Sequence, residues 1–236
     1  HANSSVSVWS GNATISGNGQ AFYGVTGAIG IESGSTLSAN IKMLDGSKIY
    51  IYANAGSNTA STTTISSAIT GDKIMYLQTA TMNPVSLTGS IDSTQPLTLV
   101  SGNYTFATTF STNPSMGVTI QSGTNVILTE DVTWGNLNSE TNTTITAPSA
   151  TTVITLGYNH RSATMRSYIR LGSINKVGTG TQAIDVDILP TTLANVTGNT
   201  TVTAGILDVG GNTNGGYLPF GNINVAANSV LRLSRT

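Results

Sequence analysis

The chain contains no cysteine, and it has few charged and few aromatic residues. The lack of cysteine excludes disulfides, thiolate metal sites and a cysteine nucleophile. Charged residues make up 8% of the 236 residues and the net charge is −1, whereas ordinary soluble domains contain about 25% charged residues. Because the basic residues are few and scattered, no patch could neutralise a phosphate backbone, and a nucleic-acid partner is not expected.

Long apolar runs and known cofactor motifs are also missing. No stretch of about 18 uninterrupted apolar residues occurs, so membrane insertion through a helix is not expected. There is no Gly-rich nucleotide loop followed by Lys and Ser/Thr, no His-Glu-X-X-His zinc motif and no dense Asp/Asn calcium repeat. The sequence therefore predicts no cofactor and no metal. The first residue is His1 and no signal-like apolar segment follows it, which is the pattern expected of a processed, exported chain.

Uncharged polar residues take the place of the missing charges. Segments 57–67 and 138–146 consist mostly of hydroxyl and amide side chains, which hydrogen-bond to water without a charge. Several asparagines stand in the Asn-X-Ser/Thr pattern of N-glycosylation, a pattern that also arises by chance in a chain rich in Asn and Thr. These candidate glycosylation sites are Asn3, Asn12, Asn103, Asn142, Asn195 and Asn199. Together with the composition, they favour an extracellular or cell-surface location.

Short β-rich runs separated by Gly, Asn and Ser occur along the whole chain, and no helical pattern competes with them. The clearest runs are 6–9, 48–53, 73–78, 97–100, 104–109, 118–121, 125–129, 151–156, 168–171, 183–189, 200–203 and 229–233. Such spacing is typical of a β-sandwich, a barrel or a β-solenoid.

Three features favour the solenoid. Aromatic residues are 6% of the chain, fewer than a sandwich core usually uses. Similar short phrases begin at Asn142, Asn199 and Ile223. The pair Ile206-Leu207 is separated from Val230-Leu231 by one coil of roughly 20 residues or more. We therefore predict a single all-β domain over residues 1–236 that forms a parallel β-helix, with a β-sandwich or jelly roll as the alternative and a soft internal boundary near residue 71.

The phrases at 202–211 and 223–233 resemble the β-helical passenger regions of bacterial autotransporters and related surface adhesins. This resemblance covers the last third of the chain and implies a β-helical fold at the cell surface, although known passengers are usually much longer. A weaker resemblance, in composition and in a short extended N-terminal segment, is to secreted filament subunits that polymerise by β-strand donation. It implies that the partners of this chain are copies of itself.

Few residues are candidates for catalysis. His160 is the only internal histidine, and because no Gly-X-Ser-X-Gly elbow occurs, an exposed loop histidine is the simpler interpretation. Asp185 and Asp187 alternate with aliphatic residues, which places both carboxylates on one face of a strand. Such a pair could bind a cation or act as a glycosidase acid and nucleophile, and a solvated face is the alternative. Charged residues that could join such a site are Asp208, Lys176 and Arg170.

Three segments are candidate interfaces. In 48–52 and 166–170, tyrosines share a strand face with basic residues, where they could stack on sugar rings or anchor a protein contact. Packing on a solvated sheet face is the alternative. Segment 1–10 carries alternating valines and is a candidate donated strand. The predicted interface residues are Val6, Val8, Trp9, Tyr50, Tyr52, Arg166, Tyr168 and Arg170.

The leading hypothesis is a non-catalytic structural protein of the cell surface that assembles with copies of itself into a filament or fibre by β-strand donation. A second hypothesis is an adhesin or carbohydrate-binding module that binds surface glycans through the Tyr/Arg faces. A third is a β-helix polysaccharide lyase or hydrolase centred on Asp185 and Asp187. The small number of titratable groups also predicts tolerance of low pH.

Overall fold

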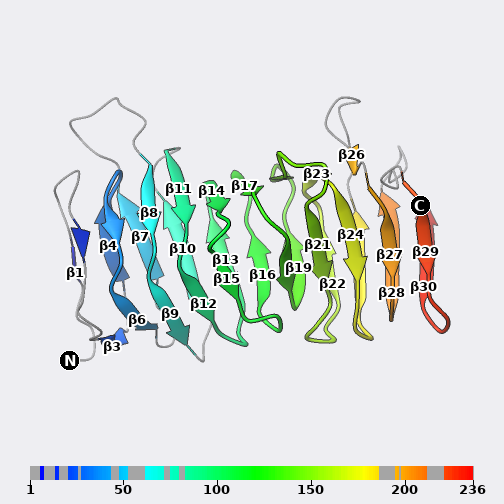
Figure 1. The fold of residues 1–236 in the computed structure, drawn as a ribbon, viewed down its shortest axis with the longest axis horizontal. Coiled ribbons are helices and arrows are strands. Elements are labelled where there is room, and N and C mark those ends of the chain that lie inside the picture. Colours follow the sequence, from blue (N-terminus) through cyan, green and yellow to red (C-terminus); the bar gives the residue numbers. More distant parts are fainter. Residues whose placement is uncertain are drawn as a thin grey trace.

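The chain folds as a β-solenoid. The computed structural model describes residues 6–7, 14–15, 21–25, 28–43, 48–52, 62–71, 75–79, 83–185, 195–196, 198–211 and 221–235. Over these residues the chain is all-β, and its sheets are parallel. The strands stack along the long axis of the molecule, from the N-terminal strands at one end to the C-terminal strands at the other (Figure 1). The predicted parallel β-helix is therefore confirmed, and the alternative of a sandwich or jelly roll, whose sheets are antiparallel, is wrong.

Each coil contributes three strands, because most strands pair with the strand three places further along the chain. The solenoid therefore has three faces. The first face holds a seven-stranded sheet followed by a four-stranded sheet, and β22 packs beside β19 where the two meet. The second face is a single nine-stranded sheet. The third face holds two five-stranded sheets, which meet where β18 packs beside β15.

The strand bounds follow the order of the coils. The first face contains β1 (Val6–Ser7), β4 (Ala28–Glu32), β7 (Lys48–Tyr52), β10 (Met75–Thr79), β13 (Leu97–Val100), β16 (Gly117–Ile120), β19 (Asn136–Ser139), β22 (Ala163–Met165), β25 (Thr181–Asp185), β28 (Ile206–Gly211) and β30 (Val230–Arg235). The second contains β2 (Thr14–Ile15), β5 (Thr36–Leu37), β8 (Thr63–Ile65), β11 (Pro84–Leu87), β14 (Gly102–Phe106), β17 (Thr124–Leu128), β20 (Thr144–Thr146), β23 (Tyr168–Leu171) and β26 (Asn195–Val196). The third contains β3 (Ala21–Val25), β6 (Asn40–Met43), β9 (Ala68–Gly71), β12 (Ser90–Asp92), β15 (Ser111–Thr112), β18 (Val132–Trp134), β21 (Val153–Leu156), β24 (Ser173–Lys176), β27 (Thr200–Val202) and β29 (Ile223–Val225).

The core is a set of columns of stacked inward side chains. Strand residues alternate between buried and half-buried positions, as in β10 and β14, because successive side chains point to opposite faces of a strand. In-register partners then stack, as Leu87, Phe106 and Leu128 do on the second face. Buried aromatic residues gather at one level, where the Phe106 ring lies 5.5 Å from that of Trp134. Elsewhere the columns are mainly aliphatic, which agrees with the low aromatic content.

Several sequence-based strand positions match the structure. The predicted strands 97–100 and 168–171 are β13 and β23. The predicted coil spacing is confirmed, since Ile206 pairs with Val230 and Leu207 with Leu231. Strands from both sides of Gly71 belong to the same sheets. The described part of the chain contains no helix with the length and apolar character needed to cross a lipid bilayer.

Candidate functional site at the C-terminal end of the solenoid

The last described coil has free strand edges. Strand β29 pairs only with β27, and β30 pairs only with β28. Both strands therefore present one edge for which the described residues supply no partner strand. Such an edge carries unpaired N–H and C=O groups and can accept another strand.

Inward side chains of this coil are exposed, although their in-register partners one coil earlier are buried. Leu233 lies over Val209, and their exposed fractions are 64% and 3%. Val225 lies over Val202, and their exposed fractions are 45% and 0%. The cause is geometric: an inward side chain in a solenoid is covered by the coils on both sides, and those of the last described coil are covered on one side only.

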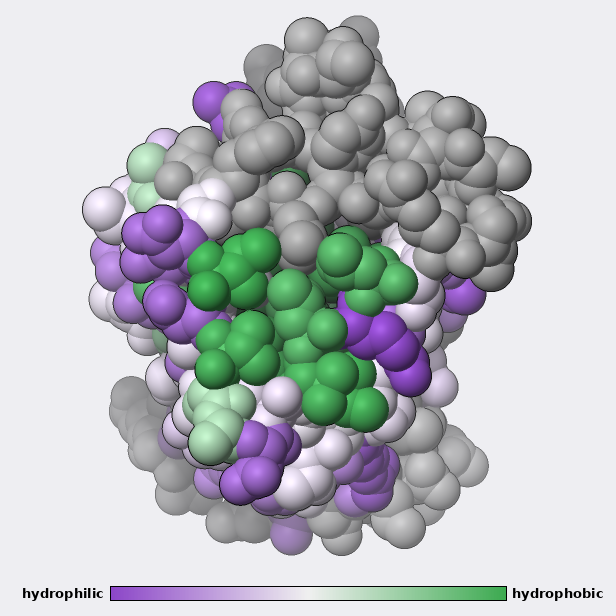
Figure 2. Space-filling model, turned by 90° about the vertical axis from the view of Figure 1, so that its right-hand side faces the viewer, coloured by the Kyte–Doolittle hydropathy of each residue, from purple (hydrophilic) through white to green (hydrophobic). Residues whose placement is uncertain are grey.

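Figure 2 looks onto this end and shows apolar side chains gathered at its centre with polar side chains around them. Four of the six exposed large hydrophobic residues in the described chain belong to β29 and β30. We define the end surface as Ile223, Val225, Val230, Leu231 and Leu233. Contiguous exposed apolar patches are uncommon on monomeric proteins and often mark interaction sites. The sequence does not distinguish these residues from those of other coils, because only their place in the stack exposes them.

A charged pair lies beside the end surface. Arg232 Nη2 is 2.5 Å from Asp208 Oδ2, and the Ser234 hydroxyl donates to Asp208 Oδ1. The hydrogen bond from Arg232 lowers the pKa of Asp208, and this effect outweighs the opposing effect of burial. Asp208 is therefore held ionised by its neighbours in β30 rather than by the other residues of the predicted acidic site.

The predicted Tyr/Arg face on 166–170 is confirmed as a pattern. Ser167 and Ile169 are buried, whereas Arg166, Tyr168 and Arg170 lie on the outer side of the solenoid. Tyr168 is partly buried and packs against the core. Whether this face binds a partner stays a prediction.

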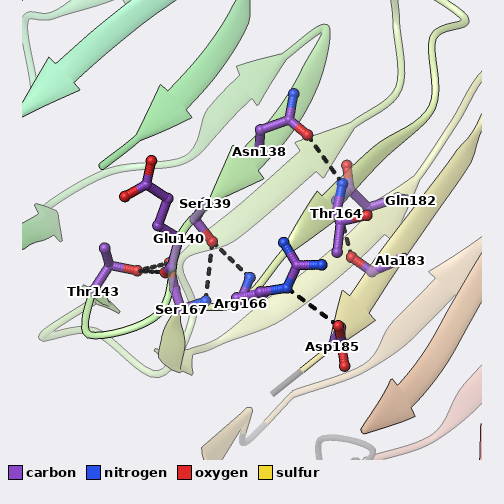
Figure 3. A network of polar contacts seen from close by, with 10 residues as sticks. All are labelled: Asn138, Ser139, Glu140, Thr143, Thr164, Arg166, Ser167, Gln182, Ala183 and Asp185. Carbon is purple, nitrogen blue, oxygen red and sulfur yellow. Dashed lines mark hydrogen bonds and ion pairs between the residues drawn. The ribbon is translucent and has the colours of Figure 1, made fainter. Parts of the chain in front are cut away.

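The predicted carboxylate pair is divided between described and undescribed residues. The Arg166 Nε atom donates to Asp185 Oδ2 at 3.2 Å (Figure 3), and both side chains are partly exposed. Asp187 lies outside the described residues. Within the described residues, no group of three or more His, Cys, Asp or Glu side chains is placed to hold a metal ion.

Side chains join the two sheets of the first face, where no backbone ladder connects β19 to β22. The Thr164 amide donates to Asn138 Oδ1, and the Arg166 and Ser167 amides donate to Ser139 Oγ (Figure 3). Deeper inside, the buried Gln182 carboxamide accepts from the amide of Leu137 and donates to its carbonyl oxygen. We call this arrangement the seam. It satisfies backbone groups that the missing ladder would leave unpaired.

Two further predicted residues have different surroundings. Lys176 is buried, with an exposed fraction of 1%, and it does not face Asp185 as a catalytic partner would. Its ammonium group donates to the carbonyl oxygens of Val177, Gly178 and Ala204, and burial lowers its pKa. His160 is exposed in a corner between coils, where its Nδ1 atom accepts from the amide of Thr179.

The remaining predicted residues lie partly outside the described chain. Strand β1, which contains Val6, pairs with β4 of the same chain. Tyr50 and Tyr52 belong to β7, but the structure does not describe their side chains. Val8 and Trp9 lie outside the described residues. Among the glycosylation candidates, Asn142 and Asn199 are exposed. Asn103 accepts a hydrogen bond from the Asn125 amide group, Asn195 lies in β26, and Asn3 and Asn12 are not described.

Comparisons of this chain with protein-family models, with characterised proteins and with solved structures gave no match. The interpretation of the end surface therefore rests on its own geometry.

Proposed function

We propose that this chain is a non-catalytic extracellular structural protein that assembles with copies of itself into a filament or fibre. The observation that carries this proposal is the exposure of core-type side chains at the end surface. Burying a Val, Leu or Ile side chain stabilises a contact by about 1.5–3 kcal/mol when the side chain starts fully exposed. Several half-exposed side chains together therefore provide a favourable free energy of association.

Three other features support the proposal. The free edges of β29 and β30 can form backbone hydrogen bonds with a further strand. The low content of charged residues means that copies of the chain repel one another only weakly when they approach. The exposed positions of Asn142 and Asn199 are compatible with glycans on an extracellular surface.

The proposal is tested by placing charge on the end surface. A Val225→Glu/Leu233→Glu variant would bury carboxylates in any contact made there. We expect the wild-type chain to form polymers as its concentration increases and the double variant to stay monomeric, both measured by sedimentation velocity and negative-stain microscopy. Ile127→Glu is the matched control, because Ile127 is an exposed aliphatic residue on the second face.

Far-ultraviolet circular dichroism would establish that the three proteins keep the same β content. Polymers of the double variant equal to those of the wild type would exclude the end surface as the contact. A wild-type chain that stays monomeric at every concentration would contradict self-assembly.

A further inference from the structure

We infer that the outer side of the second face binds an extended β-linked polysaccharide that carries carboxylate groups. This inference goes beyond the proposed function and does not depend on it, because β29 and β30 of the end surface belong to the third and first faces. The site consists of two columns of outward side chains that cross five neighbouring strands, from β11 to β23. We call them the outer columns: one holds Pro84, Asn103, Asn125, Thr144 and Tyr168, and the other holds Ser86, Thr105, Ile127, Thr146 and Arg170.

The outer columns give the second face a repeating surface. Their residues alternate along each strand with buried residues, so the two columns lie roughly 6.4–6.8 Å apart, which is two residues along a strand. Neighbouring strands are about 4.7–4.9 Å apart, so side chains recur at that interval over roughly 19 Å. This interval is close to the length of one sugar unit in an extended β-1,4-linked chain. A glycan that lies along the solenoid axis therefore places one sugar over each strand.

One outer column contains a chain of oriented hydrogen bonds. The Thr144 hydroxyl donates to Asn125 Oδ1 at 2.7 Å, and the Asn125 amide group donates to Asn103 Oδ1 at 2.8 Å. These contacts orient the amide groups before any ligand binds, which reduces the entropy lost on binding. An amide group has two N–H donors, and its oxygen has two acceptor sites. Within the described chain, Asn125 therefore keeps one donor and one acceptor site for the hydroxyl groups of a glycan.

Apolar side chains lie among these polar groups. Tyr168 follows Thr144 in register, and Ile127 is an exposed aliphatic residue in the other column. A pyranose has the same mixed character, because its ring faces present C–H groups and its edges carry hydroxyls. The tyrosine supplies a rigid apolar ring with a polar tip, and its phenol forms no hydrogen bond with the described residues. The outer columns thus offer both kinds of contact that a sugar makes.

Arg170 supplies the charge that selects an acidic ligand. It is exposed, and its guanidinium group forms no ion pair or hydrogen bond with the described residues. Arg166 and Arg232, in contrast, are paired with Asp185 and Asp208. A guanidinium group binds a carboxylate through two parallel hydrogen bonds. Because Arg170 is the only charged residue of the outer columns, a carboxylate bound there meets no like charge within them.

Two hexasaccharides of the same linkage separate the effect of charge from that of shape. The probes are the β-1,4-linked mannuronate hexamer and the β-1,4-linked mannose hexamer, in which each carboxylate is replaced by a hydroxymethyl group. Each is titrated into the full-length chain by isothermal titration calorimetry at low ionic strength. The protein concentration is one at which sedimentation velocity shows a single species. We expect the mannuronate hexamer to bind and the mannose hexamer to bind at least about tenfold more weakly.

Variants of the outer columns test the two kinds of contact. Arg170→Gln should raise the Kd for the mannuronate hexamer by about tenfold to a hundredfold, since it removes the hydrogen bonds to a charged group. Arg161→Gln is the matched control, because Arg161 is an exposed arginine in a corner outside the outer columns. Tyr168→Leu keeps an apolar side chain but removes the ring, and it should weaken the binding of both hexamers. Thermal unfolding midpoints establish that the variants keep the fold.

Three results would overturn the inference. Equal Kd values for the two hexamers would exclude a carboxylate ligand. Equal Kd values for Arg170→Gln and Arg161→Gln would exclude the outer columns as the site. The absence of binding by either hexamer would exclude this class of ligand. Each of these results would leave the proposed self-assembly intact, because the end surface is on other strands and is tested without a glycan.

Discussion

Lys176 shows how the interior of the solenoid accommodates a charge. Its side chain is buried, and its ammonium group donates to three backbone carbonyl oxygens. An ammonium group has three N–H donors, so these three acceptors use its full capacity. A charge removed from water is costly unless it is hydrogen-bonded. The carbonyl oxygens of two successive corners therefore stabilise Lys176 without a carboxylate partner among its hydrogen bonds.

Replacing this lysine tests that account. Lys176→Met keeps most of the side-chain volume but leaves the carbonyl oxygens of Val177, Gly178 and Ala204 without their ammonium donor. Because unsatisfied buried polar groups cost roughly 1–3 kcal/mol, we expect the free energy of unfolding in urea to fall by about that amount at pH 7. Lys42→Met is the matched control, since Lys42 is exposed, and such surface changes stay within about 0.5 kcal/mol.

The same pair of proteins tests the pKa of Lys176. Burial lowers this pKa in the folded chain, so the unfolded chain binds the proton more tightly. The contribution of Lys176 to stability therefore rises with pH between its folded pKa and the ordinary lysine value of about 10.4. We expect the difference in unfolding free energy between wild type and Lys176→Met to widen from pH 8 to pH 10. A difference that narrows over this range would contradict the assignment.

Among the strands, the seam between β19 and β22 is the place where side chains replace the backbone ladder. Gln182 is central to it, because its carboxamide binds both the amide and the carbonyl group of Leu137. The Asn138 and Ser139 side chains accept the amides of the following coil. Polar side chains inside a solenoid thus act here as substitutes for strand pairing.

Gln182→Leu would leave both backbone groups of Leu137 unpaired in the interior. We expect the unfolding free energy to fall by roughly 2–4 kcal/mol, because two buried groups lose their partner. The Leu137 amide should also exchange its hydrogen faster, which hydrogen–deuterium exchange with mass spectrometry of peptides over 136–139 would detect. Gln121→Leu serves as the control, because Gln121 is half-exposed. Unchanged exchange at Leu137 in Gln182→Leu would show that the seam does not depend on this side chain.

The strands could be predicted from the sequence because each one depends on a local pattern of residues. The alternation that predicts β23 lies within a few residues, and the spacing of Ile206 from Val230 is visible in repeated phrases. The residues that pair between successive coils could not be predicted. Register partners are 19 residues apart for Leu87 and Phe106 but 28 apart for Leu37 and Ile65. With coils of such variable length, the sequence cannot place Lys176 inside, pair Asp208 with Arg232 or identify the seam.

For the whole molecule, the small number of charged groups predicts how stability depends on pH. The described residues contain two ion pairs, Arg166–Asp185 and Arg232–Asp208. Both involve an arginine whose side chain is about half exposed, and such surface pairs contribute about 0–1 kcal/mol. Most of the stability therefore comes from stacked apolar columns and parallel backbone ladders, which do not titrate.

Asp208 determines whether the stability of the fold rises or falls at low pH. Its pKa is lowered in the folded chain, so the pair with Arg232 stabilises the fold above the ordinary Asp pKa of about 3.9 and loses this contribution as the pH falls through the lowered value. We expect the thermal unfolding midpoint, followed by circular dichroism, to change little from pH 7 to about pH 4 and to decrease below that. Asp208→Asn should lower the midpoint slightly at pH 7 and reduce the decrease in acid, since the titrating group is gone. Acid unfolding of the wild-type chain near neutral pH would show instead that titratable groups, and not the apolar columns and ladders, govern the stability of the solenoid.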